Sequence, residues 1–149
     1  MFPAILFGPK RIITKFGHSF GFIPCARRLY LLAAIGEVAS HLPDGLPCFY
    51  LHADSSGVGY SVHVGDGDKR VGAFRDVHWV GGANELRGVL VPRGRWVADL
   101  EDFRGEYGLS MDWDVVCLQK NGVDVVTRIA KVFSCDLVHE PLAGGGFIL

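Results

Sequence analysis

Two runs of β-prone residues, Val115–Lys120 and Val123–Thr127, flank the dipeptide Asn121-Gly122. Asn and Gly both tolerate the positive φ angles that the two central residues of a type I′ turn require. A type I′ turn joins two antiparallel strands because its twist matches theirs. The segment from Val115 to Thr127 therefore predicts a β-hairpin.

Glycine spacing favours short strands and tight turns in the rest of the chain as well. Gly accounts for 20 of the 149 residues, and its regular recurrence is typical of strands joined by turns rather than of helical bundles. In Val58–Val64, valine and tyrosine alternate with small or polar residues, the period of a strand with one buried face. We predict further strands at Ile12–Ile13, Cys48–Leu51, Val71–Phe74, Leu86–Val91 and Ile129–Val138.

One segment has the period of a helix instead. Leu31, Ile35, Val38 and Leu42 recur three or four residues apart, which places them on one face of an α-helix. The sequence Pro43-Asp44-Gly45 follows directly and contains residues that end helices. We predict one helix at about 25–42.

These elements predict a mainly β, α+β fold. About six or seven short strands favour a small closed or half-closed β-barrel capped by the one helix, because closure removes exposed strand edges. An open α+β sheet is the alternative. We expect one domain over residues 1–139. The glycine-rich run Leu142-Ala143-Gly144-Gly145-Gly146 predicts a flexible C-terminal tail at 140–149.

Charge and motifs exclude several function classes. The formal net charge is −1, which argues against a uniformly basic nucleic-acid-binding protein. The chain has no apolar run of the roughly 20 residues that a transmembrane helix needs. Its four cysteines have no C-x-x-C spacing, and no nucleotide or protease motif is present. We therefore expect no membrane contact, metal, cofactor or catalytic residue.

Arginines near one strand end form a candidate contact site. Arg87, Arg93 and Arg95 lie close in sequence to Trp96, and arginine beside an aromatic ring can hold single-stranded RNA through phosphate contacts and stacking. A different interpretation is a small β-barrel enzyme with a Cys/His site. Its candidate residues are Cys117 or Cys135 with His52, His63 or His139.

Three segments, in this order, resemble the globular domain of coronavirus non-structural protein 1, particularly the betacoronavirus form. They are Glu37–Gly45 at the end of the predicted helix, Leu86–Pro92, and Val115–Gly122 in the predicted hairpin. A fourth segment, Leu142-Ala143-Gly144-Gly145, is similar to the Leu-x-Gly-Gly site cut by the viral papain-like protease. This similarity implies cleavage at Gly144 and Gly145.

The resemblance implies a small barrel of about six or seven strands with one helix across an opening. It also implies a host-shutoff factor of the host cell cytoplasm. Members of the family block translation at the small ribosomal subunit, and some promote cleavage of host mRNA. The family's basic pair falls on Gln119 and Lys120, of which only Lys120 is charged.

We expect a non-enzymatic monomer that contacts the host small ribosomal subunit or translation factors, with mRNA as a further partner. The predicted contact residues are Lys120, Arg87, Arg93 and Arg95. A protein-interaction module without a role in RNA binding remains an alternative from a different class.

Overall fold

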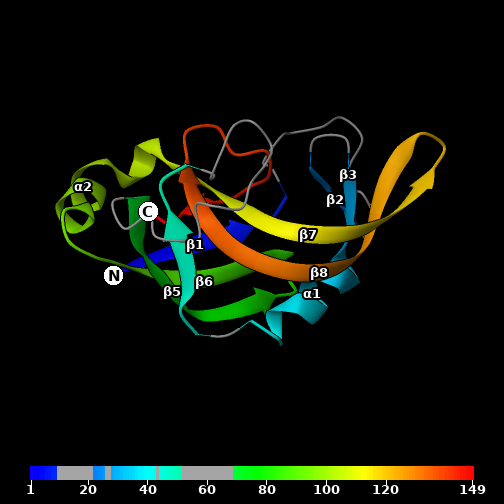
Figure 1. Ribbon diagram of the computed structural model, residues 1–149, viewed down its shortest axis with the longest axis horizontal. Helices are drawn as coiled ribbons and strands as arrows, with labels where there is room; N and C mark the ends of the chain where they lie inside the picture. Colours follow the sequence, from blue (N-terminus) through cyan, green and yellow to red (C-terminus); the bar gives the residue numbers. More distant parts are fainter. Residues whose placement is uncertain (10–21, 26–27, 43, 52–68) are drawn as a thin grey trace.

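The computed structural model describes residues 1–9, 22–25, 28–42, 44–51 and 69–149. Across these residues the protein is mainly β, as predicted, and its strands form a single sheet (Figure 1). The strands are β1 (Phe2–Phe7), β2 (Phe22–Cys25), β3 (Arg28–Leu31), β4 (Leu46–Phe49), β5 (Arg70–Val80), β6 (Glu85–Pro92), β7 (Gly108–Lys120), β8 (Val123–Val138) and β9 (Gly146–Phe147). The helices are α1 (Leu32–Ala39), α2 (Trp96–Phe103) and the 3-10 helix η3 (Arg104–Glu106).

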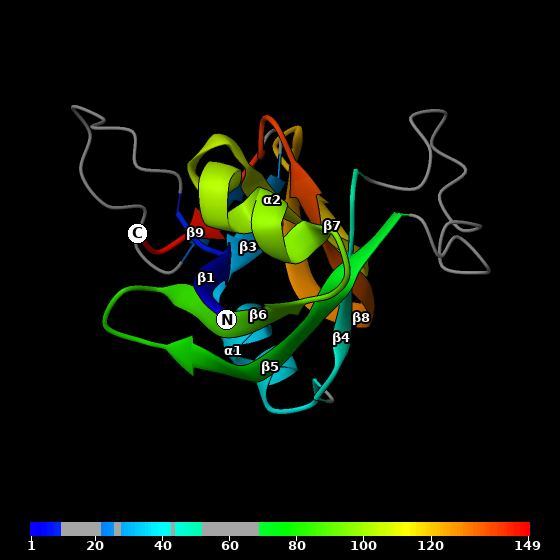
Figure 2. The same ribbon diagram turned by 90° about the vertical axis from the view of Figure 1, so that its left-hand side faces the viewer.

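The sheet is curved but not closed, so the closed form of the predicted closed or half-closed barrel is wrong. The single open sheet is closer to the alternative prediction of an open α+β sheet. Its strand order is β2-β3-β8-β7-β9-β1-β6-β5-β4, with β2 and β4 at the two edges. Figure 2 shows the sheet bending from β5 and β6 round to β7 and β8. One parallel bridge, between Tyr50 and Leu137, links the end of β4 to β8, and there the Leu51 N–H donates to the Leu137 carbonyl over 2.8 Å. A single bridge does not make a ladder, and the sheet remains open.

The described sheet has nine strands, more than the six or seven predicted. Sequence reasoning missed β1, whose apolar residues do not alternate, and β9, which is only two residues long. The predicted strands at Ile12–Ile13 and Val58–Val64 lie outside the described residues.

The helix begins later than predicted. Helix α1 covers Leu32–Ala39 rather than about 25–42, and the chain before it forms β2 and β3. Residues Arg28–Tyr30 of β3 pair in parallel with Asp124–Val126 of β8. Local periodicity cannot reveal a partner so far along the chain. Of the four residues of the predicted apolar face, Ile35 and Val38 are buried in α1, whereas Leu31 ends β3 and Leu42 lies beyond the helix.

A second helix, α2, lies in the segment after Pro92 for which no element was predicted. Trp96 and Leu100, one helical turn apart, are its two buried residues. The other six residues are half-buried or exposed and include three acidic side chains. Two buried residues are too few to give a helical period in the sequence.

The predicted hairpin is confirmed, and its turn has the expected backbone. Asn121 and Gly122 have φ angles of 53° and 78°, both positive as a type I′ turn requires. The two strands are longer than predicted, and β8 carries three more residues than β7. The register shows that these extra residues are Thr127, Ala130 and Phe133, each opposite a break in the pairing. Bulges of this kind bend a strand, and β8 curves along its length (Figure 1).

The C-terminal residues enter the sheet, although a flexible tail was predicted at 140–149. Strand β9 pairs with β1 on one side and with β7 on the other. Before it, the Gly144 N–H donates to the Gly8 carbonyl over 2.8 Å, and the Leu109 N–H donates to the Gly145 carbonyl over 3.1 Å. The glycines that resembled a flexible run thus permit close contact between backbone segments. The core beneath the sheet includes Leu6, Ile35, Phe74, Leu90, Leu109 and Leu137.

Candidate nucleic-acid interface

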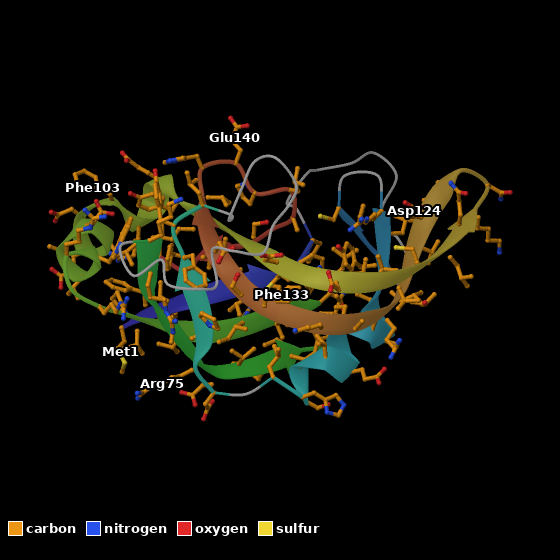
Figure 3. All side chains as sticks on the ribbon, viewed as in Figure 1. Met1, Arg75, Phe103, Asp124, Phe133 and Glu140 are labelled. Atoms are coloured by element: carbon orange, nitrogen blue, oxygen red, sulfur yellow. The ribbon has the colours of Figure 1, made fainter. Side chains whose placement is uncertain are left out.

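The four predicted contact residues do not form one surface. Arg93 and Arg95 lie between β6 and α2, at one end of the long axis of the molecule, whereas Lys120 lies at the tip of the β7–β8 hairpin at the other end (Figure 1). Figure 3 marks these ends with Phe103 in α2 and Asp124 beside the hairpin tip. Arg87 belongs to β6, between β1 and β5 in the sheet. Only Arg93 and Arg95 are brought together.

Arg87 is engaged within the protein. Its Nε donates to Oε2 of Glu85 over 2.7 Å, and the Glu85 side chain is largely buried. The carboxylate would lose its charged partner if Arg87 turned to an external ligand. We therefore exclude Arg87 from the interface.

Backbone contacts position Arg93 and Arg95 in the short connection between β6 and α2. Strand β6 ends at Pro92, and the Arg93 N–H donates to the Val71 carbonyl of β5 over 2.8 Å. Gly94 then takes a φ of 55°, a conformation suited to glycine, and α2 starts directly after Arg95. The Arg95 guanidinium lies 5.4 Å from the centre of the Trp96 ring, a cation–π contact. Both arginines are exposed.

Arg70 belongs to the same surface, although sequence reasoning did not select it. Its Nε donates to the Gly72 carbonyl over 2.8 Å, and its guanidinium lies 5.5 Å from the Phe49 ring centre. Burial lowers the pKa of Arg70, and the nearby positive charge of Arg93 lowers it further. Arg70, Arg93 and Arg95 are called the arginine cluster below.

Four aromatic side chains from four segments meet beside the arginine cluster. The rings of Tyr50 and Trp96 are 5.3 Å apart, and those of Tyr107 and His139 are 5.6 Å apart. The Tyr50 ring stands nearly perpendicular to those of Tyr107 and His139. Its hydroxyl is hydrogen-bonded to Nε2 of His139 at 3.0 Å. These four residues are called the aromatic cluster.

Tyr107 is held in place by α2. Its hydroxyl donates to Oδ2 of Asp99 over 2.9 Å. Burial raises the pKa of Tyr107 to about 12, with the hydrogen bond and the charge of Asp99 adding to the effect. The phenol therefore stays neutral at physiological pH and keeps donating to the carboxylate. This bond anchors one side of the aromatic cluster to the helix that carries Trp96.

The cysteines of the alternative Cys/His site lie in different surroundings. Burial raises the pKa of the Cys135 thiol well above its usual range, so the thiol stays protonated and unreactive. Cys117 is exposed and pairs with Val126 near the hairpin turn, whereas His139 follows the far end of β8 at Val138. His52 and His63 lie outside the described residues. Among the residues that the structure describes, no group of three or more His, Cys, Asp or Glu side chains could hold a metal ion.

The proposed cleavage site is built into the fold. Gly145 is buried and Gly144 half-buried, and the backbones of both are hydrogen-bonded to neighbouring segments. A protease binds an extended stretch of its substrate, so cleavage at Gly144 and Gly145 would require this segment to leave the sheet first.

Sequence reasoning missed Arg70, Tyr50 and Tyr107, and it named His139 only as part of a Cys/His site, because these residues come from separate elements. Tyr50 follows β4, Arg70 begins β5, Tyr107 precedes β7 and His139 follows β8. The curvature of the sheet and the Tyr50–Leu137 bridge bring these chain positions together. A pairing of β4 with β8, had it been predicted, would have placed Tyr50 beside His139.

Comparisons with known proteins give no relative for this chain: no family model matches it, and no curated protein or solved structure does so. In the described part of the chain, neither α-helix has the length and apolar character needed to cross a lipid bilayer.

Proposed function

We propose that this protein is a host-shutoff factor that inhibits translation in the cytoplasm of an infected cell by contacting RNA, of the small ribosomal subunit or of an mRNA. The contact surface is the arginine cluster together with the aromatic cluster. The observation that carries the proposal is the meeting of Arg70, Arg93 and Arg95 with Tyr50 and Trp96 at one end of the molecule.

Two kinds of interaction, contacts with phosphate and stacking on bases, favour RNA as the ligand of this surface. Guanidinium groups make charge-assisted hydrogen bonds with phosphate oxygens, and they release counterions from the RNA backbone when they bind. The exposed guanidinium planes of Arg93 and Arg95 and the exposed His139 ring can stack on unpaired bases, at about 1–3 kcal/mol per base. Trp96 is buried and supports the Arg95 guanidinium from below. Arg70 and Arg93 already repel each other, so an anion between them would relieve that repulsion.

The resemblance to coronavirus non-structural protein 1 is the reason for proposing a role in host shutoff. Its three segments fall at the end of α1, on β6, and on the β7–β8 hairpin. One lies at a helix end and two lie on separate strands of the sheet. The surface around α2 is not among them, so this chain would use its own residues for the RNA contact.

A cell-free translation assay tests the proposal. Purified protein is titrated into a mammalian lysate with a capped reporter, and both product synthesis and reporter mRNA integrity are followed. We expect inhibition by the wild-type protein, and we expect Arg93→Ala/Arg95→Ala to need about tenfold more protein for the same inhibition. Lys120→Ala is the matched control, because it removes an exposed cation at the opposite end.

Each outcome of the assay has a distinct meaning. Lack of inhibition by the wild-type protein would contradict the host-shutoff assignment. Inhibition that persists in the double variant would remove the arginine cluster from the interface, and relief by Lys120→Ala alone would move the contact to the hairpin tip. Intact reporter mRNA would indicate a block of the ribosome, and shortened mRNA would indicate induced cleavage.

A further inference from the structure

Part of β8 lacks a neighbouring strand on the side away from β7. On that side, β3 pairs with β8 only as far as Val126. The next contact of this kind is the bridge from Tyr50 to Leu137. No strand in the described part of the chain pairs with residues 127–136 on this side. Backbone N–H and C=O groups at such an edge can form hydrogen bonds with a further strand.

Helix α1 lies along this open edge and forms one wall of a groove. Figure 1 shows α1 on the side of β8 opposite to β7. The groove has a volume of about 340 Å³. One wall includes Ala34 and Val38 of α1 and Leu42 beyond the helix, and the other wall is the unbroken run from Arg128 to Val132 of β8. Side chains in a regular strand alternate between two faces, so a groove that touches five consecutive residues follows the edge of the strand.

The bulge at Ala130 places two cations on the outer side of this edge. Ile129 pairs with Val115, and Lys131 pairs with Asp114, so that Ala130 is an extra residue between them. Ile129 is buried, whereas Arg128 and Lys131 on either side of the bulge are both exposed. Without the bulge, residues 128 and 131 would point to opposite faces.

The charges of the groove favour an acidic occupant. It holds Arg128 and Lys131 against one carboxylate, that of Glu37. Arg128 makes no ion pair within the residues that the structure describes. The Lys131 ammonium lies 4.9 Å from the Phe133 ring centre, which leaves its hydrogen-bond donors available to a ligand.

We propose that this groove binds an extended acidic segment of a partner protein, which adds to β8 as a further strand. Main-chain hydrogen bonds to the edge of β8 would supply affinity. Carboxylates facing Arg128 and Lys131, and small apolar side chains against α1, would supply specificity. The groove spans five residues of β8, about 16 Å at the usual rise per residue. This proposal does not depend on the proposed function, because the groove is separate from the arginine and aromatic clusters.

The test uses the full chain and a fluorescein-labelled short peptide in which Val and Glu alternate, with fluorescence anisotropy as the readout. Two control peptides replace every Glu by Lys or methylate the central backbone nitrogens. We expect the Val/Glu peptide to bind about tenfold more tightly than either control. The variant Arg128→Glu/Lys131→Glu should reverse the preference, so that the Val/Lys peptide binds better. Because both residues are exposed, the variant should keep the circular dichroism spectrum of the wild type.

A matched variant, Arg75→Glu/Lys120→Glu, changes two exposed cations outside the groove and should retain the wild-type preference.

Failure of the Val/Glu peptide to bind at up to about 1 mM would overturn the proposal, as would equal binding of the two charged peptides by the wild type. If methylation has no effect and a short oligouridylate displaces the peptide, the groove is an anion surface and strand addition is wrong. Self-association that the Arg128→Glu/Lys131→Glu variant abolishes would assign the groove to a second copy of this chain and would also overturn the proposal.

Discussion

Gly145 occupies a point where two backbone segments touch. A Cβ atom at this position would lie 2.1 Å from the carbonyl oxygen of Leu109, far inside van der Waals contact. The neighbouring Gly146, in β9, has nothing within 4 Å of the same virtual atom. Two adjacent glycines in the same segment therefore have different roles, the first required for close approach and the second replaceable.

Gly145→Ala should lower the free energy of unfolding by about 1–3 kcal/mol, the usual cost of overpacking a site that cannot relax freely. Gly146→Ala should change it by less than about 0.5 kcal/mol. Urea denaturation of the two variants followed by circular dichroism measures the difference. Equal losses would show that β9 shifts to accept a side chain at either position.

The raised pKa of Tyr107 makes the stability of the protein depend on pH in the alkaline range. Its pKa is raised to about 12, chiefly by burial and then by the bond to Asp99, whereas an unfolded tyrosine ionises near pH 10. Because the folded pKa is the higher one, the stabilisation is complete below about pH 10 and is lost as the pH rises toward 12.

A phenolate absorbance titration of the folded protein should therefore contain a late transition from Tyr107 at a pKa of about 12. Tyr107→Phe should remove that transition, and Asp99→Asn should move it to lower pH by removing the charged acceptor. If the late transition survives in Tyr107→Phe, it belongs to another tyrosine. The bond to Asp99 would then not define this side of the cluster.

Among the elements, the features that depend on neighbouring residues were predicted correctly from the sequence. The turn at Asn121-Gly122 and the apolar face around Ile35 are both present, since φ preference and helical period depend on nearby residues. The bulges of β8 were not foreseen. The break at Thr127 coincides with the point where one predicted strand ends and the next begins, whereas those at Ala130 and Phe133 lie inside the predicted strand Ile129–Val138.

The candidate interface could be predicted only in part, for the same reason. Arg93 and Arg95 were selected because Trp96 follows them in the sequence. Lys120 and Arg87 were selected too, but the former lies at the far end and the latter is bonded to Glu85. Strand pairing sets which segments share a surface, and the pairs that decide it here join residues far apart in the chain.

At the scale of the whole molecule, one buried carboxyl group helps hold the two halves of the chain together. Asp136 of β8 is fully buried, and its Oδ1 accepts from the Phe49 N–H of β4 over 3.1 Å. This bond lies next to the Tyr50–Leu137 bridge. The two contacts bring the β4 edge of the open sheet back against β8, and they carry Tyr50 toward His139 in the aromatic cluster.

Asp136→Ala should lower the free energy of unfolding by about 1–3 kcal/mol, the cost of leaving the buried Phe49 N–H without an acceptor. Asp136→Asn keeps a side-chain oxygen at the same place and should retain most of the stability. Asp114→Ala, which removes an exposed carboxylate from β7, should have almost no effect. Urea denaturation gives the three values, and amide hydrogen exchange at Phe49 and Leu51 shows where the loss occurs.

Equal losses in Asp136→Ala and Asp136→Asn would contradict the assignment, since they would mean that the acceptor oxygen does not hold β4 to β8. Faster exchange at Leu51 in Asp136→Ala would mean that the bridge to Leu137 opens with the bond, and that the aromatic cluster depends on the approach of β4 to β8.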